Sequence, residues 1–309
     1  MPLLVSKFNH SSTRVQSKNK VLVLMATFNG QAYLKEQIDS VINQKNVDIN
    51  ILISDDMSTD DSLKIIESYA RKNNRIMVLE NKKRFGSAAP NFFHLIKKCD
   101  LKDYDYIAFS DQDDIWFKDK LQHGIDEMNE HNADGFSSDI FAYWPVNEKK
   151  ILIKKSYKQK KYDYIFEGPG PGCSQIFTSK SFQAFKKFIE TNYKFLETID
   201  YHDWLIYTFY RHNKFKWHIS SKPKMLYRQH QNNQIGVNSG LKAKFSRIKD
   251  IQNNWYKDQI IYNFNTVVRE DFRNFIFLNK LIFKPFSLRR KLSHSVFVWL
   301  LIVTGVFKK

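Results

Sequence analysis

The chain has 309 residues, and its content of 42% hydrophobic and 15% aromatic residues is ample for a packed core, so global disorder is excluded. Lysine and arginine number 49 and aspartate and glutamate number 32, which leaves a formal net charge of +17. Such a charge attracts nucleic acid, an anionic membrane or a phosphorylated ligand, and by itself it does not choose among them.

The N-terminal residues 1–19 form a polar tail that lacks the apolar stretch of a signal peptide. The two cysteines, Cys99 and Cys173, are far apart in the sequence and indicate a reducing compartment more than a disulfide scaffold. We therefore expect the main part of the chain to be cytoplasmic.

Short apolar runs alternate with amphipathic segments between residues 21 and 109. The apolar runs predict four buried strands, at residues 21–25, 49–54, 76–79 and 104–109. The segments between them have apolar residues at helical spacing and predict helices that cover a sheet. This alternation indicates a parallel sheet with right-handed crossovers, an architecture typical of nucleotide-binding proteins. There is no Walker A sequence and no G-x-G-x-x-G after the first strand, so phosphates must be held in another way.

Three carboxylates, Asp111, Asp113 and Asp114, follow the fourth predicted strand. In an open α/β sheet, ligands bind at the carboxyl ends of the strands. Clustered aspartates repel one another unless a cation offsets their charge, and Mg²⁺ or Mn²⁺ prefers such oxygen ligands. The alternative is an N-cap for the helix predicted at residues 118–128, which would explain one aspartate but not three.

A second carboxylate pair, Asp55 and Asp56, follows the second predicted strand. If the strands are parallel, this pair and the acidic cluster lie along the same edge of the sheet. Asp56 would then be placed to accept a hydrogen bond from a nucleobase N–H group. The alternative for Asp55 and Asp56 is a turn followed by a helix cap.

Five motifs in order carry a family resemblance. Residues 21–30, DDMSTD at 55–60 and SDQDDIW at 110–116 resemble the nucleotide-sugar half of the family 2 (GT-A) glycosyltransferases. HDW at 202–204 and LYRQHQNN at 226–233 resemble the rhamnosyltransferases of bacterial cell-wall and capsular polysaccharide synthesis. The resemblance implies an α/β GT-A (Rossmann-like) domain at residues 20–236, with a mostly parallel sheet flanked by helices. Residues 237–309 would form a C-terminal helical extension.

The resemblance also implies roles on the donor side. Asp111 and Asp113 match the family's DXD metal site, and Asp56 matches its base-binding aspartate. His230 would be a third metal ligand or a diphosphate contact, although a lone histidine is more often structural. Where the family commonly has Pro-x-Tyr-Asn, this chain has Ala-Thr-Phe-Asn, so Phe28 can stack on a base but offers no hydroxyl. The residues implied in binding the nucleotide-sugar are Thr27, Phe28, Asn29, Asp55, Asp56 and Asp111.

On the acceptor side, Asp203 matches the general base of an inverting transfer, with His202 and Trp204 as its neighbours. A base must take the proton of the acceptor hydroxyl while the sugar carbon is attacked from the face opposite the diphosphate. The alternative for Asp203 is a helix cap. Residues 168–174, which include Gly172 and Cys173, resemble the family's acceptor-side loop; an ordinary tight connection is equally compatible with them. Cys173 is interpreted as a packed small residue, because the mechanism needs no thiol nucleophile.

The predicted extension mixes basic residues with Phe, Ile, Leu and Trp. Its apolar stretch at residues 296–307 is well short of the ~20 residues that a membrane-spanning helix needs. This pattern fits helices that lie in the surface of an anionic cytoplasmic leaflet. The alternatives are a helix packed on the catalytic domain and a contact in a homodimer.

These observations lead us to expect a metal-dependent, inverting glycosyltransferase at the inner face of the cell membrane. The resemblance implies transfer of L-rhamnose from dTDP-rhamnose to a lipid-linked saccharide, with a UDP-hexose as the alternative donor. A nucleic-acid-binding protein is disfavoured, because the acidic edge would repel a phosphate backbone unless it held metal. A nucleotidyltransferase on a similar sheet remains a third possibility and would release pyrophosphate instead of a nucleoside diphosphate.

Overall fold

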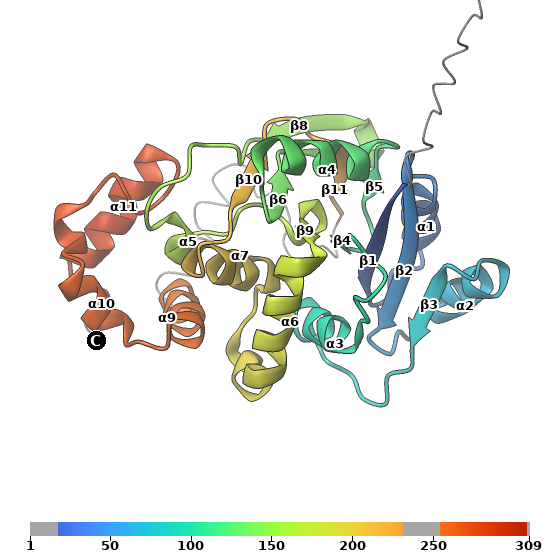
Figure 1. The fold of residues 1–309 in the computed structure, drawn as a ribbon, viewed down its shortest axis with the longest axis horizontal. Helices are drawn as coiled ribbons and strands as arrows, with labels where there is room; N and C mark the ends of the chain where they lie inside the picture. Colours follow the sequence, from blue (N-terminus) through green and yellow to red (C-terminus); the bar gives the residue numbers. More distant parts are fainter. Residues whose placement is uncertain (1–17, 231–253, 308–309) are drawn as a thin grey trace, which may run out of the picture.

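The computed structural model describes residues 18–230 and 254–307 (Figure 1). Most of the predicted polar tail and the predicted domain boundary near Gly236 lie outside these residues. The main sheet has seven strands in the order β10-β6-β9-β4-β1-β2-β3. Their bounds are β1 Asn19–Thr27, β2 Val47–Asp55, β3 Ile76–Leu79, β4 Tyr106–Ser110, β6 Gly135–Ser138, β9 Ile176–Thr178 and β10 Trp217–Ser220. The four predicted strands are β1 to β4, so the predicted mixed α/β fold with a mostly parallel sheet is confirmed.

Strand register brings the carboxyl ends of the central strands together. In the parallel pairs of β1 with β2 and with β4, Thr27 lies opposite Asp55 and Met25 lies opposite Ser110. The residues that follow β1, β2 and β4 therefore meet at one edge of the sheet. Only β9 runs antiparallel to its two neighbours, β4 and β6.

Helices cover both faces of this sheet because alternate residues of each strand point to opposite sides. Leu22 and Leu24 belong to a core that includes residues of α3, α6 and α7. Val21 and Val23 belong to a second core that includes residues of α1 and α4. The helices have the bounds α1 Leu34–Ile42, α2 Ser62–Lys72, α3 Ala88–Lys98, α4 Lys120–His131, α6 Ser179–Asn192 and α7 His202–His212.

A second sheet of four strands, in the order β5-β11-β7-β8, adjoins the acidic cluster. Its strands are β5 Ile115–Trp116, β7 Ile140–Trp144, β8 Lys149–Ile153 and β11 Met225–Arg228. The antiparallel pairing of β5 with β11 brings residues 225 and 226 opposite residues 115 and 116. The segment around His230 is therefore held beside the residues that follow β4.

The C-terminal helices are packed on the α/β domain. They are α9 Trp255–Val268, α10 Phe272–Leu278 and α11 Leu292–Val303, and they lie at the end of the molecule opposite β1–β3 (Figure 1). Their buried side chains, such as Phe264 and Val298, share a core with Trp204 of α7 and Phe166 of α5 (Asp163–Phe166). No described helix is both long enough and apolar enough to cross a membrane.

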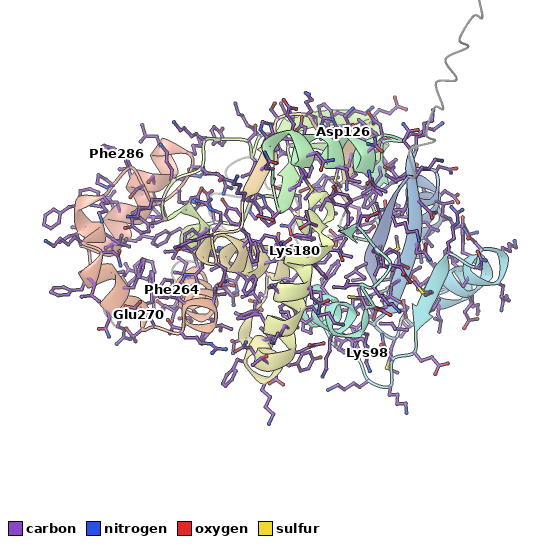
Figure 2. The ribbon with its side chains drawn as sticks, in the orientation of Figure 1. Lys98, Asp126, Lys180, Phe264, Glu270 and Phe286 are labelled. Atoms are coloured by element: carbon purple, nitrogen blue, oxygen red, sulfur yellow. The ribbon has the colours of Figure 1, made fainter. Side chains whose placement is uncertain are left out.

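This C-terminal part nevertheless exposes large apolar side chains. Phe277 is 81% exposed and Phe283 is 74% exposed. Figure 2 shows Phe286, which is 60% exposed, at the outer margin of the C-terminal part. Further exposed apolar residues of this part are Leu278, Ile282, Leu292, Phe297, Leu300 and Val303.

The remaining short helices are the 3-10 turns η1 Pro145–Asn147, η2 Gly172–Ser174, η3 Tyr193–Thr198 and η4 Leu281–Phe283.

Candidate active site

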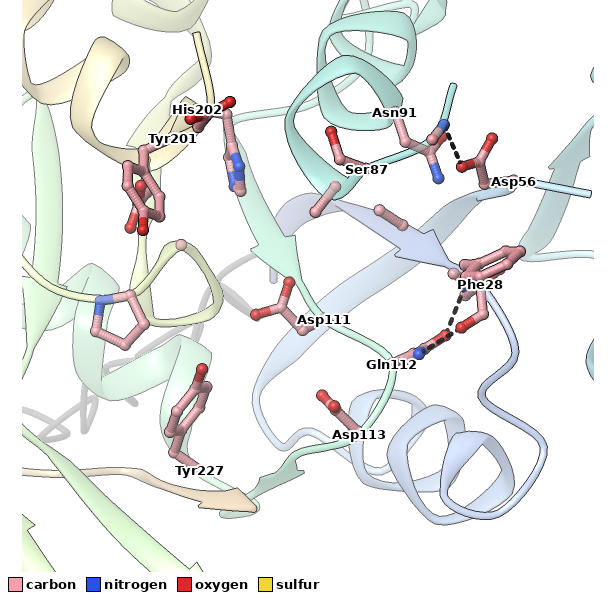
Figure 3. A pocket seen from close by; sticks show the side chains of 18 of the residues that line it. Phe28, Asp56, Ser87, Asn91, Asp111, Gln112, Asp113, Tyr201, His202 and Tyr227 are labelled. Atoms are coloured by element: carbon pink, nitrogen blue, oxygen red, sulfur yellow. Dashed lines mark hydrogen bonds between the residues drawn. The ribbon is translucent and has the colours of Figure 1, made fainter. Parts of the chain in front are cut away.

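A cavity of about 460 Å³ opens at the carboxyl ends of β1, β2 and β4. Its walls come from the residues that follow these strands, the start of α3, the glycine loop before η2, the start of α7, and the first residue of α9. In Figure 3, Phe28 and Asp56 lie at one side of this cavity, His202 and Tyr201 at the other, and Asp111 between them. The cavity therefore has two distinct ends that meet at the acidic cluster.

Asp111 and Asp113 both line the cavity. Burial, and then the charge of Asp113, raise the pKa of Asp111 to about 7. His230 Nε2 lies 2.9 Å from Asp113 Oδ2. Two carboxylates and an imidazole suit a divalent cation such as Mg²⁺ or Mn²⁺, whose charge would relieve the repulsion that raises this pKa. The residues at this position therefore fit a metal ion.

Asp114 points into the protein and not into the cavity. Its carboxyl is fully buried, lies near Asp111 and Cys173, and accepts a hydrogen bond from Arg228 N at 3.3 Å. Burial raises the pKa of Asp114 well above its usual value. The next helix, α4, begins at Lys120 after Asp119, so none of the three clustered aspartates is its N-cap.

Cys173 is also part of this buried layer. Its side chain is fully buried and does not line the cavity, and burial raises the pKa of its thiol well above the usual value. A protonated, inaccessible thiol is a packing group, as expected from the sequence, and Cys173 lies outside the cavity wall, unlike the acceptor-side position that the resemblance implied.

At the end of the cavity that contains Phe28 and Asp56, three of the predicted residues hold loops in place. Thr27 lines the cavity and donates from Oγ1 to Asp55 Oδ2 at 2.8 Å. Asp55 does not line the cavity; its carboxylate also accepts from Ser58 N at 2.8 Å. Asn29 Oδ1 accepts from Thr59 N at 2.8 Å, so Asn29 joins the loops that follow β1 and β2. The turn role considered for Asp55 is the one that the structure displays.

Asp56 lies in the cavity wall and binds the loop that precedes α3. Its carboxylate accepts hydrogen bonds from Phe85 N and, at 2.8 Å, from Gly86 N. Nearby, the Arg84 guanidinium lies 4.1 Å from the centre of the Phe28 ring. An aromatic face, a cation and a carboxylate are thus gathered where a nucleobase would fit.

Gln112, for which the sequence suggested no role, fixes Phe28. Its amide accepts from Phe28 N at 2.7 Å and donates to Phe28 O at 2.9 Å (Figure 3). A Cβ atom at Gly30 would lie 2.4 Å from Gln112 Oε1, which explains a glycine at that position. The middle residue of the acidic motif therefore couples the loop after β1 to the segment that contains Asp111 and Asp113.

At the opposite end, Asp203 and His202 begin α7 and line the cavity. Burial raises the pKa of Asp203 to about 6, opposed by a hydrogen bond from Trp204 N and by the charge of Lys155. His202 stacks on Phe92, with ring centres 4.0 Å apart, and burial lowers its pKa to about 3. At neutral pH the carboxylate is therefore ionised and the imidazole is neutral.

The glycine loop approaches His202 closely. A Cβ atom at Gly172 would lie 2.6 Å from His202 Nε2, so only glycine permits this contact without a shift. Trp204, by contrast, faces the core shared with α5 and α9, where its indole N–H donates to Tyr164 O at 2.9 Å. The structure therefore brings Gly172, His202 and Asp203 together in the cavity and leaves Trp204 out of its wall.

Several residues of the cavity wall were not predicted. Tyr227 lies in β11 and belongs to the motif at residues 226–233, which was an available signal. Asn91 of α3 donates to Ser54 O at 2.9 Å. Asp200, Tyr201 and Trp255 lie in no recognised motif, and Trp255 is distant in sequence from every other residue of the wall.

Comparisons with known proteins agree with this architecture. The model of the family described as "Glycosyl transferase family 2" matches residues 22–190. The dTDP-rhamnosyl transferase RfbG of Shigella flexneri is 41% identical over 290 residues, which cover 92% of this chain and 100% of that protein. The putative teichuronic acid biosynthesis glycosyltransferase TuaG of Bacillus subtilis is 30% identical over 38% of this chain and 44% of its own length.

Solved structures show the same fold at lower identity. TarS of S. aureus in complex with UDP-GlcNAc has a TM-score of 0.52 at 14% identity and covers 84% of this chain and 75% of its own. The mannosyltransferase PcManGT of Pyrobaculum calidifontis, in complex with GDP-Man and Mn²⁺, has a TM-score of 0.53 at 13% identity. That match covers 82% of this chain and 65% of the other.

Proposed function

The chain belongs to glycosyl transferase family 2, and on that premise we propose that it transfers L-rhamnose from dTDP-rhamnose to a saccharide acceptor with inversion. One observation carries the proposal: Asp111 and Asp113, which suit a metal, and the separate, partly buried carboxylate of Asp203 face a single cavity from different elements. The choice of donor rests on the 41% identity to a dTDP-rhamnosyl transferase.

The donor would occupy the end of the cavity that contains Phe28 and Asp56. Phe28 offers an aromatic face for the base, and Asp56 offers a hydrogen-bond acceptor once its contacts with residues 85 and 86 are shared or released. Asp111 and Asp113, with His230 beside them, would hold the metal ion. When bound, a divalent ion neutralises the negative charge that develops on the departing diphosphate.

Asp203 would act as the general base. It is ionised at neutral pH, and a pKa raised to about 6 makes it a stronger base than an ordinary aspartate. His202 is a poor alternative, since a pKa of about 3 describes an imidazole that binds a proton weakly. Direct attack by the acceptor oxygen inverts the anomeric carbon and needs no enzyme nucleophile, which agrees with the burial of Cys173.

The acceptor is proposed to be linked to lipid at the inner face of the cell membrane. Phe277 and Phe283 are exposed and lie close in sequence to the exposed basic residues Arg273 and Lys280, and this combination suits an anionic leaflet. A second copy of the chain is the alternative partner for this apolar surface. The apolar surface lies at the end of the molecule opposite β1–β3, so the proposed membrane contact leaves the nucleotide end of the cavity clear.

The donor is tested by incubating the protein with dTDP-rhamnose, UDP-glucose or UDP-N-acetylglucosamine, with Mn²⁺ or with excess chelator. We expect release of dTDP from dTDP-rhamnose to exceed release of UDP and to stop in the chelator. Preferential release of UDP would favour a UDP-hexose donor, for which the fold shared with the UDP-GlcNAc complex of TarS is the supporting observation. Release of pyrophosphate from dTTP would instead indicate a nucleotidyltransferase.

A further inference from the structure

The wall beside Asp203 contains an aromatic pair contributed by two distant segments. Tyr201 precedes α7, Trp255 is the first residue of α9, and both line the cavity. Their rings meet edge to face with centres 5.2 Å apart and an interplanar angle of 84°. The Trp255 indole N–H donates to Asp200 Oδ2 at 2.6 Å. An aromatic corner with an adjacent carboxylate therefore stands two residues from the proposed base.

The position of Trp255 is fixed by the way α9 is attached to the catalytic domain. Gln259, one turn along α9, accepts from Asp200 N at 3.0 Å and donates to Thr198 O at 2.9 Å. Tyr256 donates from its hydroxyl to Phe166 O at 2.7 Å. These contacts fix both partners of the hydrogen bond between Trp255 and Asp200, so the two residues have defined positions in the cavity wall.

The chemistry of this corner suits a sugar ring. A pyranose has a face of C–H groups, which packs on the electron-rich face of an aromatic ring, and hydroxyls at its rim, which need polar partners. Asp200 is exposed and has a second carboxylate oxygen, Oδ1, that can accept from such a hydroxyl. A nucleobase is better served at the other end of the cavity, where Phe28 and Asp56 lie.

We propose that Trp255 and Tyr201 form the platform on which the acceptor pyranose stacks, with Asp200 accepting a hydrogen bond from one of its hydroxyls. This inference rests on the proposed function, because it places the acceptor beside Asp203. Part of the acceptor site then belongs to the C-terminal helices, and α9 is a component of the catalytic unit. Removing the Trp255 ring should weaken binding of the acceptor sugar and leave binding of the nucleotide unchanged.

The test uses saturation-transfer NMR on the full chain with methyl α-L-rhamnopyranoside, methyl β-D-galactopyranoside and methyl N-acetyl-β-D-glucosaminide, in the presence of dTDP and the diamagnetic ion Mg²⁺. We expect at least one glycoside to bind the wild type through protons of one ring face. Trp255→Ala should weaken that binding by about fivefold or more, and Trp255→Phe should restore most of it. Trp144→Ala, which removes a partly exposed indole outside the cavity, should have no effect.

Calorimetry with dTDP should give the same affinity for Trp255→Ala as for the wild type, which shows that the variant is folded. Unchanged glycoside binding in Trp255→Ala would overturn the proposal, as would failure of all three glycosides to bind the wild type. If the proposed function is wrong, the wild type will release no dTDP from dTDP-rhamnose, whether or not a glycoside binds. The release of dTDP therefore tests the proposed function, and the binding of glycosides tests the platform.

Discussion

His230 Nε2 lies 2.9 Å from Asp113 Oδ2, although the two residues are 117 positions apart. β11, which pairs with β5 immediately after the acidic motif, leads directly to His230. The contact ties the second sheet to the carboxylates that would hold the metal. It also gives the metal proposal a third residue that can be tested separately.

The first prediction concerns the two carboxylates that face the cavity. Asp113→Asn should abolish metal-dependent binding of dTDP, because a neutral amide is a far weaker ligand for a hard cation than a carboxylate. Isothermal calorimetry with dTDP, with and without Mn²⁺, measures this. Asp126→Asn on the exposed side of α4 is the matched control and should bind like the wild type. Equal metal-dependent affinity in Asp113→Asn and the control would refute the assignment.

His230→Ala should retain dTDP binding but require more Mn²⁺, by roughly 10- to 100-fold, since residues that ligate or orient a metal ligand contribute on that scale. His94→Ala removes a partly buried histidine of α3 that does not line the cavity and serves as the comparison. A Mn²⁺ titration that is identical for His230→Ala and the wild type would mean that His230 is only a structural neighbour of Asp113.

The burial of Asp203 predicts an effect on stability. Its pKa is raised from 3.8 to about 6 in the folded protein, so the native state binds more protons than the unfolded state between these values. Stability should therefore fall as pH rises from about 4 to 6, by on the order of 2 to 3 kcal/mol from this group. Asp203→Asn should remove that loss and make the metal-free protein more stable at pH 7, as measured by urea unfolding.

The control for this effect is Asp119→Asn. The carboxyl of Asp119 is exposed, and its pKa is lowered chiefly by its hydrogen bond with Lys224. That variant should be slightly less stable at pH 7 than the wild type, the opposite sign. If Asp203→Asn also destabilises the protein at pH 7, the carboxyl is held by favourable interactions, and the account of its raised pKa is wrong.

The exposed apolar side chains of the C-terminal part predict membrane binding. Phe277→Glu and Phe283→Glu should each reduce co-sedimentation with vesicles that contain phosphatidylglycerol, because each replaces an inserted ring with a repelled charge. Added salt should weaken the binding of the wild type. Phe195→Glu, in η3 and 67% exposed, should bind like the wild type. If all three variants co-sediment equally, this surface serves another partner, and ultracentrifugation would show whether that partner is a second copy.

Substitutions suit this test better than truncation does. Leu288 and Val298 are fully buried in the C-terminal core, and Arg290 is nearly so and donates to Gly168 O at 2.6 Å. Ending the chain before them would expose the core and release the glycine loop, so loss of binding would have no single cause.

The sequence predicts the first half of the fold well because that half depends on local patterns. The runs that become β1 to β4 are short and apolar, and parallel pairing alone brings Asp56 and Asp111 to one edge. The second sheet was not predicted, because β8 lies in a lysine-rich stretch and both β7 and β11 pair with residues of other segments. Pairing of that kind leaves little local signal.

The positions of the site residues also depend on contacts that local sequence patterns do not reveal. Asp203 and Trp204 are adjacent in one motif, yet successive helical residues point about 100° apart, so one lines the cavity and the other enters the core. Cys173 likewise follows Gly172 but is buried beneath the cavity. Trp255 reaches the wall only because α9 docks against the segment before α7. No sequence motif predicts this docking.

The most direct test of the account measures rhamnose transfer and dTDP affinity side by side for Asp203→Asn and His202→Gln. The transfer assay supplies dTDP-rhamnose, Mn²⁺ and the lipid fraction of cells that lack this chain. We predict that Asp203→Asn binds dTDP like the wild type and transfers rhamnose about 10²- to 10⁴-fold more slowly, whereas His202→Gln keeps most of its rate. Near-normal transfer by Asp203→Asn, with loss of transfer in His202→Gln, would contradict the assignment of the base.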